Sequence, residues 1–244
     1  MDSPVGLLAW MEVPRRHAAA FDAWYTFEHV GERIAVTGFL RATRYRRIPD
    51  DDPTTVRYFT LYEVENAAVF ASPEYLDRLE NPSAWTREIV PVSTLRWRIA
   101  APLRATLGAG RSGTALVVEL GADRNASDDL LAHLCALHAS HDVAAARIYE
   151  ADATASATRD TTAEARATGP GAESPPHTVA IVELPHGTKP DAVAHGIRAT
   201  SPCDRITAIE LIYDLTRPGP AAASEPASDR RLATTRGDQK GSKK

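Results

Sequence analysis

The chain has 244 residues and a formal charge of −4, and 43% of its residues are hydrophobic and 25% charged. These values are typical of a globular protein, and the slight acidity argues against a basic face for a nucleic-acid partner. The sequence has neither a basic segment leading into an apolar leader nor a run of about 18 apolar residues, so we expect a cytoplasmic protein that does not span a membrane. The two cysteines, Cys135 and Cys203, lack CxxC spacing and are expected to be reduced thiols.

Residues 1–105 show strand and helix patterns in the order βαββαβ. Helical spacing predicts a first helix over residues 15–36 and a second helical region over residues 66–89, which Pro73 and Pro82 interrupt. Short apolar runs or strict alternation predict four strands, over residues 6–13, 38–47, 57–64 and 94–100. This order predicts one ferredoxin-like unit, with a four-stranded antiparallel sheet and both helical regions on one face.

Residues 106–217 repeat this order with weak identity. Helices are expected over residues 128–141 and 189–199, and strands over residues 114–120, 143–150, 178–184 and 205–215. Positions in the two halves match at a spacing of about 105 residues, which indicates duplication of a small domain. The matched pairs are Glu12 with Glu119 and Arg44 with Arg147, while Glu63 and Glu183 also match but lie further apart, mainly because the segment over residues 151–176 is inserted between them.

Two segments have almost no large apolar residues. Residues 151–176 are rich in Ala, Thr, Gly, Ser and Pro, and residues 218–244 are small and polar. Such segments bury too little apolar surface to offset the entropy of ordering. We therefore predict a mobile loop within the second repeat and a disordered tail after it.

A sheet with both helices on one face leaves its other face bare, and that face must be covered. The second repeat can cover it, and the connector over residues 102–112 is short. The sequence therefore predicts an α+β protein of two tandem ferredoxin-like βαββαβ repeats, packed sheet to sheet as an intrachain pseudo-dimeric α+β barrel.

The first predicted helix carries the most informative stretch, FDAWYTFEHVGER, over residues 21–33. At about 100° per residue, Glu28 shares a face with Phe21 and Trp24, and His29 lies one turn beyond Tyr25. An imidazole can gain or lose a proton near neutral pH, so His29 is a candidate acid or base. The competing interpretation is that these residues only pack. The same helical spacing places four apolar residues on one side of the helix: Ala20, Phe21, Trp24 and Phe27.

The stretch WYTFEHVGER followed by GFLRATRYRR resembles the dimeric α+β barrel superfamily, particularly its EthD-like and methylmuconolactone-isomerase-like proteins. The segment ENPSAWTR over residues 80–87 is similar to a piece found in some bacterial relatives. The resemblance covers residues 5–100 and implies that His29 lines a cleft between helices and sheet. Because the superfamily includes monooxygenases, isomerases, cyclases, decarboxylases, peroxidases and proteins without known activity, it does not specify the reaction.

Candidate site residues follow from these patterns. Tyr25, one turn before His29, can hold a substrate oxygen, and Glu28 is a third candidate catalytic residue. On the second strand Arg41, Thr43 and Tyr45 share one face, while Arg44 and Arg46 share the other, and an inward arginine would suit a carboxylate or enolate. The register is needed to choose between the faces. The expected substrate-binding residues are Arg41, Tyr45, Tyr62 and Trp85, each of which has edge charge or core packing as its alternative role.

No metal or cofactor is expected. The spacing of His133, His138 and His141 does not match HExxH, no histidine is singled out for haem, and GxGxxG and phosphate-loop motifs are lacking. The sequence predicts a cofactor-independent enzyme that transfers protons on a small, oxygenated, partly apolar metabolite, of isomerase, lyase or cyclase type. The alternatives are a non-catalytic ligand-binding or accessory protein and a cofactor-free monooxygenase. The expected partner is the small-molecule substrate, with pairing into a homodimer left open.

Overall fold

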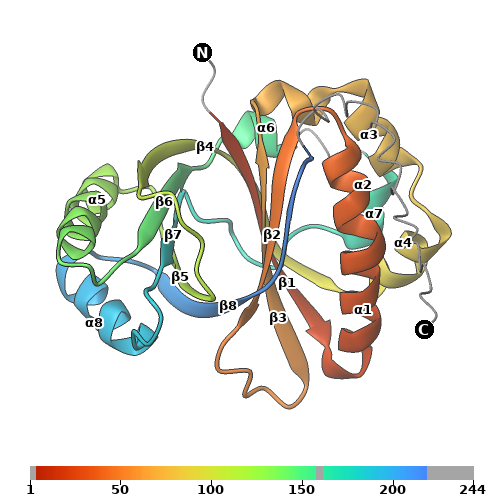
Figure 1. Ribbon diagram of the computed structural model, residues 1–244. Helices are drawn as coiled ribbons and strands as arrows, with labels where there is room; N and C mark the ends of the chain where they lie inside the picture. Colours follow the sequence, from red (N-terminus) through yellow and green to blue (C-terminus); the bar gives the residue numbers. More distant parts are fainter. Residues whose placement is uncertain (1–3, 158–161, 219–244) are drawn as a thin grey trace, which may run out of the picture.

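The computed structural model describes residues 4–157 and 162–218, and within these residues eight strands pair into a closed antiparallel barrel with helices outside it (Figure 1). The first four strands are β1 (Val5–Pro14), β2 (Phe39–Arg47), β3 (Thr55–Val64) and β4 (Thr94–Leu107). The other four are β5 (Thr114–Leu120), β6 (Ala145–Glu150), β7 (Thr178–Glu183) and β8 (Arg205–Thr216). The predicted α+β class and the barrel are confirmed.

The strand order around the barrel is β1-β3-β2-β8-β5-β7-β6-β4. Strands of the first half therefore lie in the order β4-β1-β3-β2, and those of the second half in the matching order β8-β5-β7-β6. The two sheets do more than face each other, because β2 pairs with β8 and β4 pairs with β6. Strand β4 is longer than the sequence predicts, since its last residues leave the first sheet to pair with β6. The predicted boundary after residue 105 falls inside this strand.

Helices cover the barrel in two groups (Figure 1). On the first half lie a continuous helical segment and the connection between β3 and β4, while the second half carries two main helices. Side chains cap several helix starts: Ser72 accepts a hydrogen bond from the Tyr75 amide and Ser83 from the Thr86 amide, at 3.2 and 2.9 Å. The first segment contains η1 (Arg15–His17), α1 (Ala18–Trp24), η2 (Tyr25–His29) and α2 (Val30–Ala35). The others are η3 (Ala67–Ala71), α3 (Pro73–Glu80), α4 (Ala84–Ile89), η4 (Val90–Val92), α5 (Arg124–Ala139), α6 (Ala153–Ala157), α7 (Ala163–Thr168) and α8 (Pro190–Thr200).

Three apolar cores result from this arrangement. One fills the barrel interior, where Trp10, Phe59 and Trp97 from neighbouring strands meet. The other two lie between the outer faces of the two half-sheets and their helices. Because most strands are covered on both faces, their sequences are nearly continuous apolar runs.

The segment over residues 151–176, which the sequence predicts to be a mobile loop, contains helices in its described part. The described part of this segment holds α6 and α7, and α7 lies beside α3 and η4 of the first half (Figure 1). Charged contacts rather than large apolar residues dock it: Glu164 pairs with Arg33, and Glu173 pairs with Arg205 at 2.9 Å. Of the predicted tail, residues 219–244 lie outside the described part of the chain. No helix among the described residues is long and apolar enough to cross a bilayer.

Candidate functional site

A cavity of about 70 Å³ lies in the first half, between the helical segment α1–α2 and the outer face of the sheet. One ordered water molecule needs about 10–15 Å³, so the cavity has room for a ligand group. Strands β1, β3 and β4 supply Leu7, Tyr62 and Arg98, and α7 supplies Glu164. The helical segment contributes a mostly aromatic part of the wall: Phe21, Trp24, Tyr25, His29 and Arg33.

A π-helical turn, η2, decides which side chains of this helix face the cavity. A π-turn holds more residues than an α-turn, so the residues after it are rotated relative to a regular helix, and such turns often occur at functional sites. His29 therefore points inward, is only 7% exposed, and packs against Trp24 and Tyr25 at ring-centroid distances of 4.5 and 4.8 Å. Phe27, expected on the apolar side, is 81% exposed.

The same turn directs Glu28 away from the cavity, which corrects its predicted catalytic placement. Its Oε1 accepts hydrogen bonds from Trp24 Nε1 at 3.2 Å, Ser83 Oγ at 2.5 Å and Thr86 Oγ1 at 3.2 Å. Glu28 therefore fastens the helix to α4, because Ser83 caps that helix and Thr86 belongs to its first turn.

Two buried phenols meet at the cavity wall. The Tyr62 hydroxyl donates a hydrogen bond to the Tyr25 hydroxyl at 3.3 Å, and the His29 and Tyr62 rings lie 6.4 Å apart. Burial raises the pKa of Tyr25 above its ordinary value and raises the pKa of Tyr62 well above it. Both phenols therefore stay protonated at neutral pH. Because Tyr62 donates its single proton to Tyr25, it is the Tyr25 hydroxyl that can donate a hydrogen bond to a ligand oxygen.

A buried charge pair lines the cavity. Arg33, one helical turn after His29, is 3% exposed and forms an ion pair with Glu164 of α7. Burial alone would lower the pKa of Arg33, but the nearby Glu164 carboxylate outweighs it and the pKa is raised. The sequence interpretation missed this pair. The spacing of His29 and Arg33 was a usable signal, whereas nothing in the sequence indicated that α7 would reach the first half.

The other predicted binding residues lie elsewhere. Arg41 pairs with Asp214 of β8, with a 2.7 Å hydrogen bond, and Tyr45 lies inside the barrel, where its hydroxyl donates to Glu183 at 3.3 Å. Trp85 packs against the first-half core without lining the cavity. Alternation along β2 explains the result, because Ala42 and Arg44 face the helices while Tyr45 faces the barrel interior.

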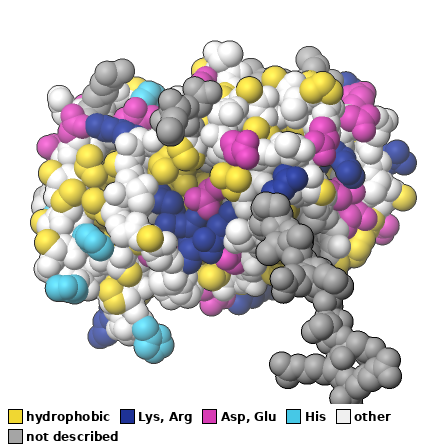
Figure 2. Space-filling model, turned by 45° about the horizontal axis from the view of Figure 1, so that its top comes forward, with side chains coloured by type: hydrophobic (Ala, Val, Ile, Leu, Met, Phe, Trp, Pro, Cys, Tyr) yellow, Lys and Arg dark blue, Asp and Glu magenta, His cyan; other side chains and the backbone are white. Residues whose placement is uncertain are grey.

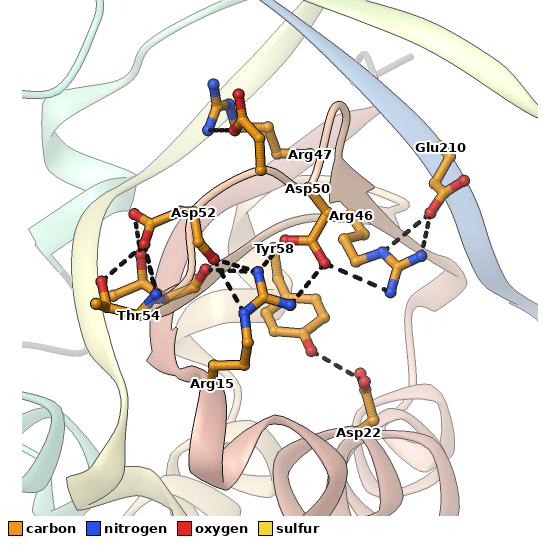
Figure 3. Close-up of polar contacts among 11 residues, drawn as sticks. Arg15, Asp22, Arg46, Arg47, Asp50, Asp52, Thr54, Tyr58 and Glu210 are labelled. Atoms are coloured by element: carbon orange, nitrogen blue, oxygen red, sulfur yellow. Dashed lines mark hydrogen bonds and ion pairs between the residues drawn. The ribbon is translucent and has the colours of Figure 1, made fainter.

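The hairpin between β2 and β3 anchors the start of the helical segment (Figure 3). Arg15, just before α1, donates to Asp50 at 2.6 Å, and this contact lowers the pKa of Asp50. Tyr58 donates to Asp22 of α1 at 2.9 Å. Elsewhere charges of both signs are interspersed, with a group of basic side chains beside acidic ones on the face shown in Figure 2. Among the described residues, no group of three or more His, Cys, Asp or Glu is arranged to hold a metal ion.

No protein-family model and no curated protein matches this chain by sequence. Solved structures do share its fold. An anthrone oxidase-like protein superposes with a TM-score of 0.55 at 10% identity, over 92% of this chain and 98% of its own. A candidate monooxygenase from Fusobacterium nucleatum gives 0.52 at 8% identity, over 89% and 96% of the two chains. A candidate chlorite dismutase gives 0.51 at 11% identity, over 87% and 96%.

Identities this low show the fold alone. These neighbours share the α+β barrel architecture of this chain. The barrel architecture that the sequence predicts is therefore shared with known proteins. The reaction has to be argued from the cavity itself.

Proposed function

We propose that this chain is a cofactor-independent enzyme that transfers a proton on a small, oxygenated, partly apolar substrate, with His29 as the acid or base. The observation that carries the proposal is the place of His29: a buried imidazole at the wall of an aromatic cavity, beside Tyr25. An imidazole can exchange a proton near neutral pH, which a general acid or base requires. The proposal is consistent with the names of two structures that share this fold, an anthrone oxidase-like protein and a candidate monooxygenase.

The cavity supplies the other parts that proton transfer needs. Tyr25 is a neutral donor that can bind a substrate oxygen and stabilise the charge that develops on it when a carbon or hydroxyl loses its proton. The hydrogen bond that Tyr25 accepts from Tyr62 makes it a stronger donor. Phe21 and Trp24 offer apolar walls that exclude water and strengthen these interactions. An isomerase, a lyase or a cyclase would use the same first step, removal of a proton from the substrate.

A cofactor-free monooxygenase is the second candidate. Its first step is the same deprotonation, after which the electron-rich substrate reduces O₂, so that one oxygen atom enters the substrate and the other leaves as water. The aromatic walls suit an activated phenol as substrate. The chain shares its fold with an anthrone oxidase-like protein and a candidate monooxygenase, which supports monooxygenation as the second candidate reaction.

We also propose that the two halves are tandem ferredoxin-like repeats and that the chain belongs to the EthD-like branch. The matching strand orders β4-β1-β3-β2 and β8-β5-β7-β6 support the duplication. The motif around Tyr25 and His29 supports the branch.

The test is a panel of enolisable ketones, lactones and phenols, assayed with the full chain for uptake of solvent deuterium and for O₂ consumption. We expect His29→Gln to lower the rate by about 10²–10⁴-fold. His195→Gln is the matched control, because His195 is exposed on α8 and is far in sequence from the residues that line the cavity. Unchanged turnover in the His29 variant would refute the proposal.

Two further readouts separate the alternatives. Deuterium uptake without O₂ consumption supports the isomerase-type reaction, and stoichiometric O₂ consumption supports the monooxygenase. Tight binding of a panel member with neither signal supports the non-catalytic ligand-binding alternative and contradicts the enzyme.

A further inference from the structure

Glu164 separates two hollows on the first half of the molecule. The inner one is the cavity of about 70 Å³ beside His29. The outer one is a groove of about 210 Å³ between α4 and α7. Glu164 and Val90 line both hollows, so the side chain of Glu164 forms part of the partition between them.

The partition rests on a single buried ion pair. Arg33 and Glu164 side chains are 3% and 9% exposed, and the Arg33 Nη1 atom has no hydrogen-bond partner among the described residues. A buried guanidinium without a counterion is strongly unfavourable. Glu164 therefore supplies the negative charge that Arg33 requires, while part of the guanidinium's hydrogen-bonding capacity stays unused at the cavity wall.

Other polar contacts of the helix that carries Glu164 lie nearer the surface. The Ala163 amide donates to Glu80 Oε2 at 2.9 Å, and Arg166 pairs with Glu80 at 3.1 Å. The side chains of Arg166 and Glu80 are 60% and 52% exposed, and exposed ion pairs contribute little to stability. An anion that displaced Glu164 would break one buried ion pair and replace it with another, because it would itself satisfy the charge of Arg33.

We propose that the ligand of this cavity carries an anionic oxygen, a carboxylate or phenolate on an aromatic or partly apolar frame, and that it binds Arg33 by displacing Glu164. The guanidinium then binds the ligand's oxygen through Nη1 and Nη2, and the inner and outer hollows join. Glu164 acts as an internal competitor that excludes neutral ligands, since these cannot replace its charge. The proposal rests on the proposed function for the location of the site, and it names the class of substrate.

Calorimetric titration of the full chain with benzoate, and with benzamide as its neutral counterpart, tests this. We expect the wild type to prefer benzoate, and Glu164→Gln to bind benzoate at least about tenfold more tightly, because the competing carboxylate is gone. The double variant Arg33→Gln/Glu164→Gln, which has neither charge, should lose the preference for benzoate. Equal benzoate affinity in the wild type and Glu164→Gln would overturn the proposal.

A thermal-shift measurement covers the case in which Glu164→Gln is poorly folded. Its melting temperature should rise with benzoate more than that of the wild type, and should not respond to benzamide or to the same concentration of chloride. An equal response to benzoate and chloride would show non-specific anion stabilisation and would contradict the proposal.

Failure of this inference differs from failure of the proposed function. Charge-dependent benzoate binding together with turnover that His29→Gln does not affect would support the anion site and refute the catalytic role of His29. Turnover of a neutral substrate that depends on His29 and is unchanged in Glu164→Gln would support the catalytic role of His29 and refute the anion site.

Discussion

Arg44 is a buried cation whose counterion is partly exposed, and this asymmetry gives an unusual prediction. Its side chain is 1% exposed and its guanidinium carbon lies 4.0 Å from the centroid of the Tyr25 ring. Its nitrogens donate to Asp22 at 3.0 Å and to Thr26 at 3.1 Å. Asp22 is 42% exposed and also accepts from Tyr58 (Figure 3). Removing the exposed partner should therefore cost more than removing the buried one.

The two substitutions differ in what they leave behind. Asp22→Asn leaves the Arg44 charge buried without a counterion, for which we expect a loss of about 3 kcal/mol, the lower end of the range for a buried pair because water reaches Asp22. Arg44→Met leaves a carboxylate that water and Tyr58 can still solvate, so the loss should be about 1.5–2 kcal/mol, the lower part of the range for hydrogen bonds to a charged group. The double variant should resemble Arg44→Met.

Urea denaturation, followed by far-ultraviolet circular dichroism, measures these free energies of unfolding. Asp129→Asn is the control, because Asp129 is exposed on α5 and should stay within about 0.5 kcal/mol of the wild type. If Asp22→Asn costs less than Arg44→Met, then Arg44 does not depend on Asp22 for its charge balance and the reasoning is wrong.

Three further changes have distinct expected outcomes. Burial raises the pKa of Glu119 above its ordinary 4.5, so ionisation of this carboxyl group lowers the free energy of unfolding as the pH rises through the folded-state pKa. In urea denaturation, the free energy of unfolding of Glu119→Gln should equal that of the wild type at about pH 4 and exceed it at neutral pH. Gly38 has a φ of +91° and a Cβ there would lie 2.4 Å from Val69, so Gly38→Ala should lower the free energy of unfolding by about 1–3 kcal/mol. Tyr62→Phe should change stability by no more than about 1.5 kcal/mol. If Tyr62 stabilises charge on the substrate through its hydrogen bond to Tyr25, however, that variant should lower kcat by about 10²-fold on the panel substrate, and an unchanged kcat would exclude this role.

Local pattern was enough to predict the strands and the barrel, but not the orientation of every site residue. Alternation and apolar runs depend on burial on one or both faces of a sheet, and these features are visible in the sequence. A π-turn is a different matter, because the choice between α and π geometry at Tyr25–His29 depends on packing against the sheet. The assumption of a regular α-helix therefore placed Glu28 on the inner face and His29 at its edge. In the structure His29 lines the cavity, while Glu28 points to Ser83.

The second failure of sequence reasoning has another cause. Residues 151–176 are too small and polar to form a core, which correctly excludes a large apolar element there. Composition does not reveal that a polar segment can dock through charges onto a distant surface. Glu164 lies 131 positions from Arg33, and only the closed barrel brings them together.

The two halves share a strand order and differ in what covers the sheet, and this difference accounts for the aromatic wall of the first-half cavity. On the second half, α5 and α8 bring small and aliphatic side chains, and Leu130, Leu134 and Ile197 are fully buried against the sheet. On the first half, large rings and a π-turn meet the sheet, and several of these rings line the cavity. The same cavity is lined by Glu164, which the second half supplies. Because of this exchange the first half alone would have an open cavity and an unpaired Arg33, so the proposed site requires both halves.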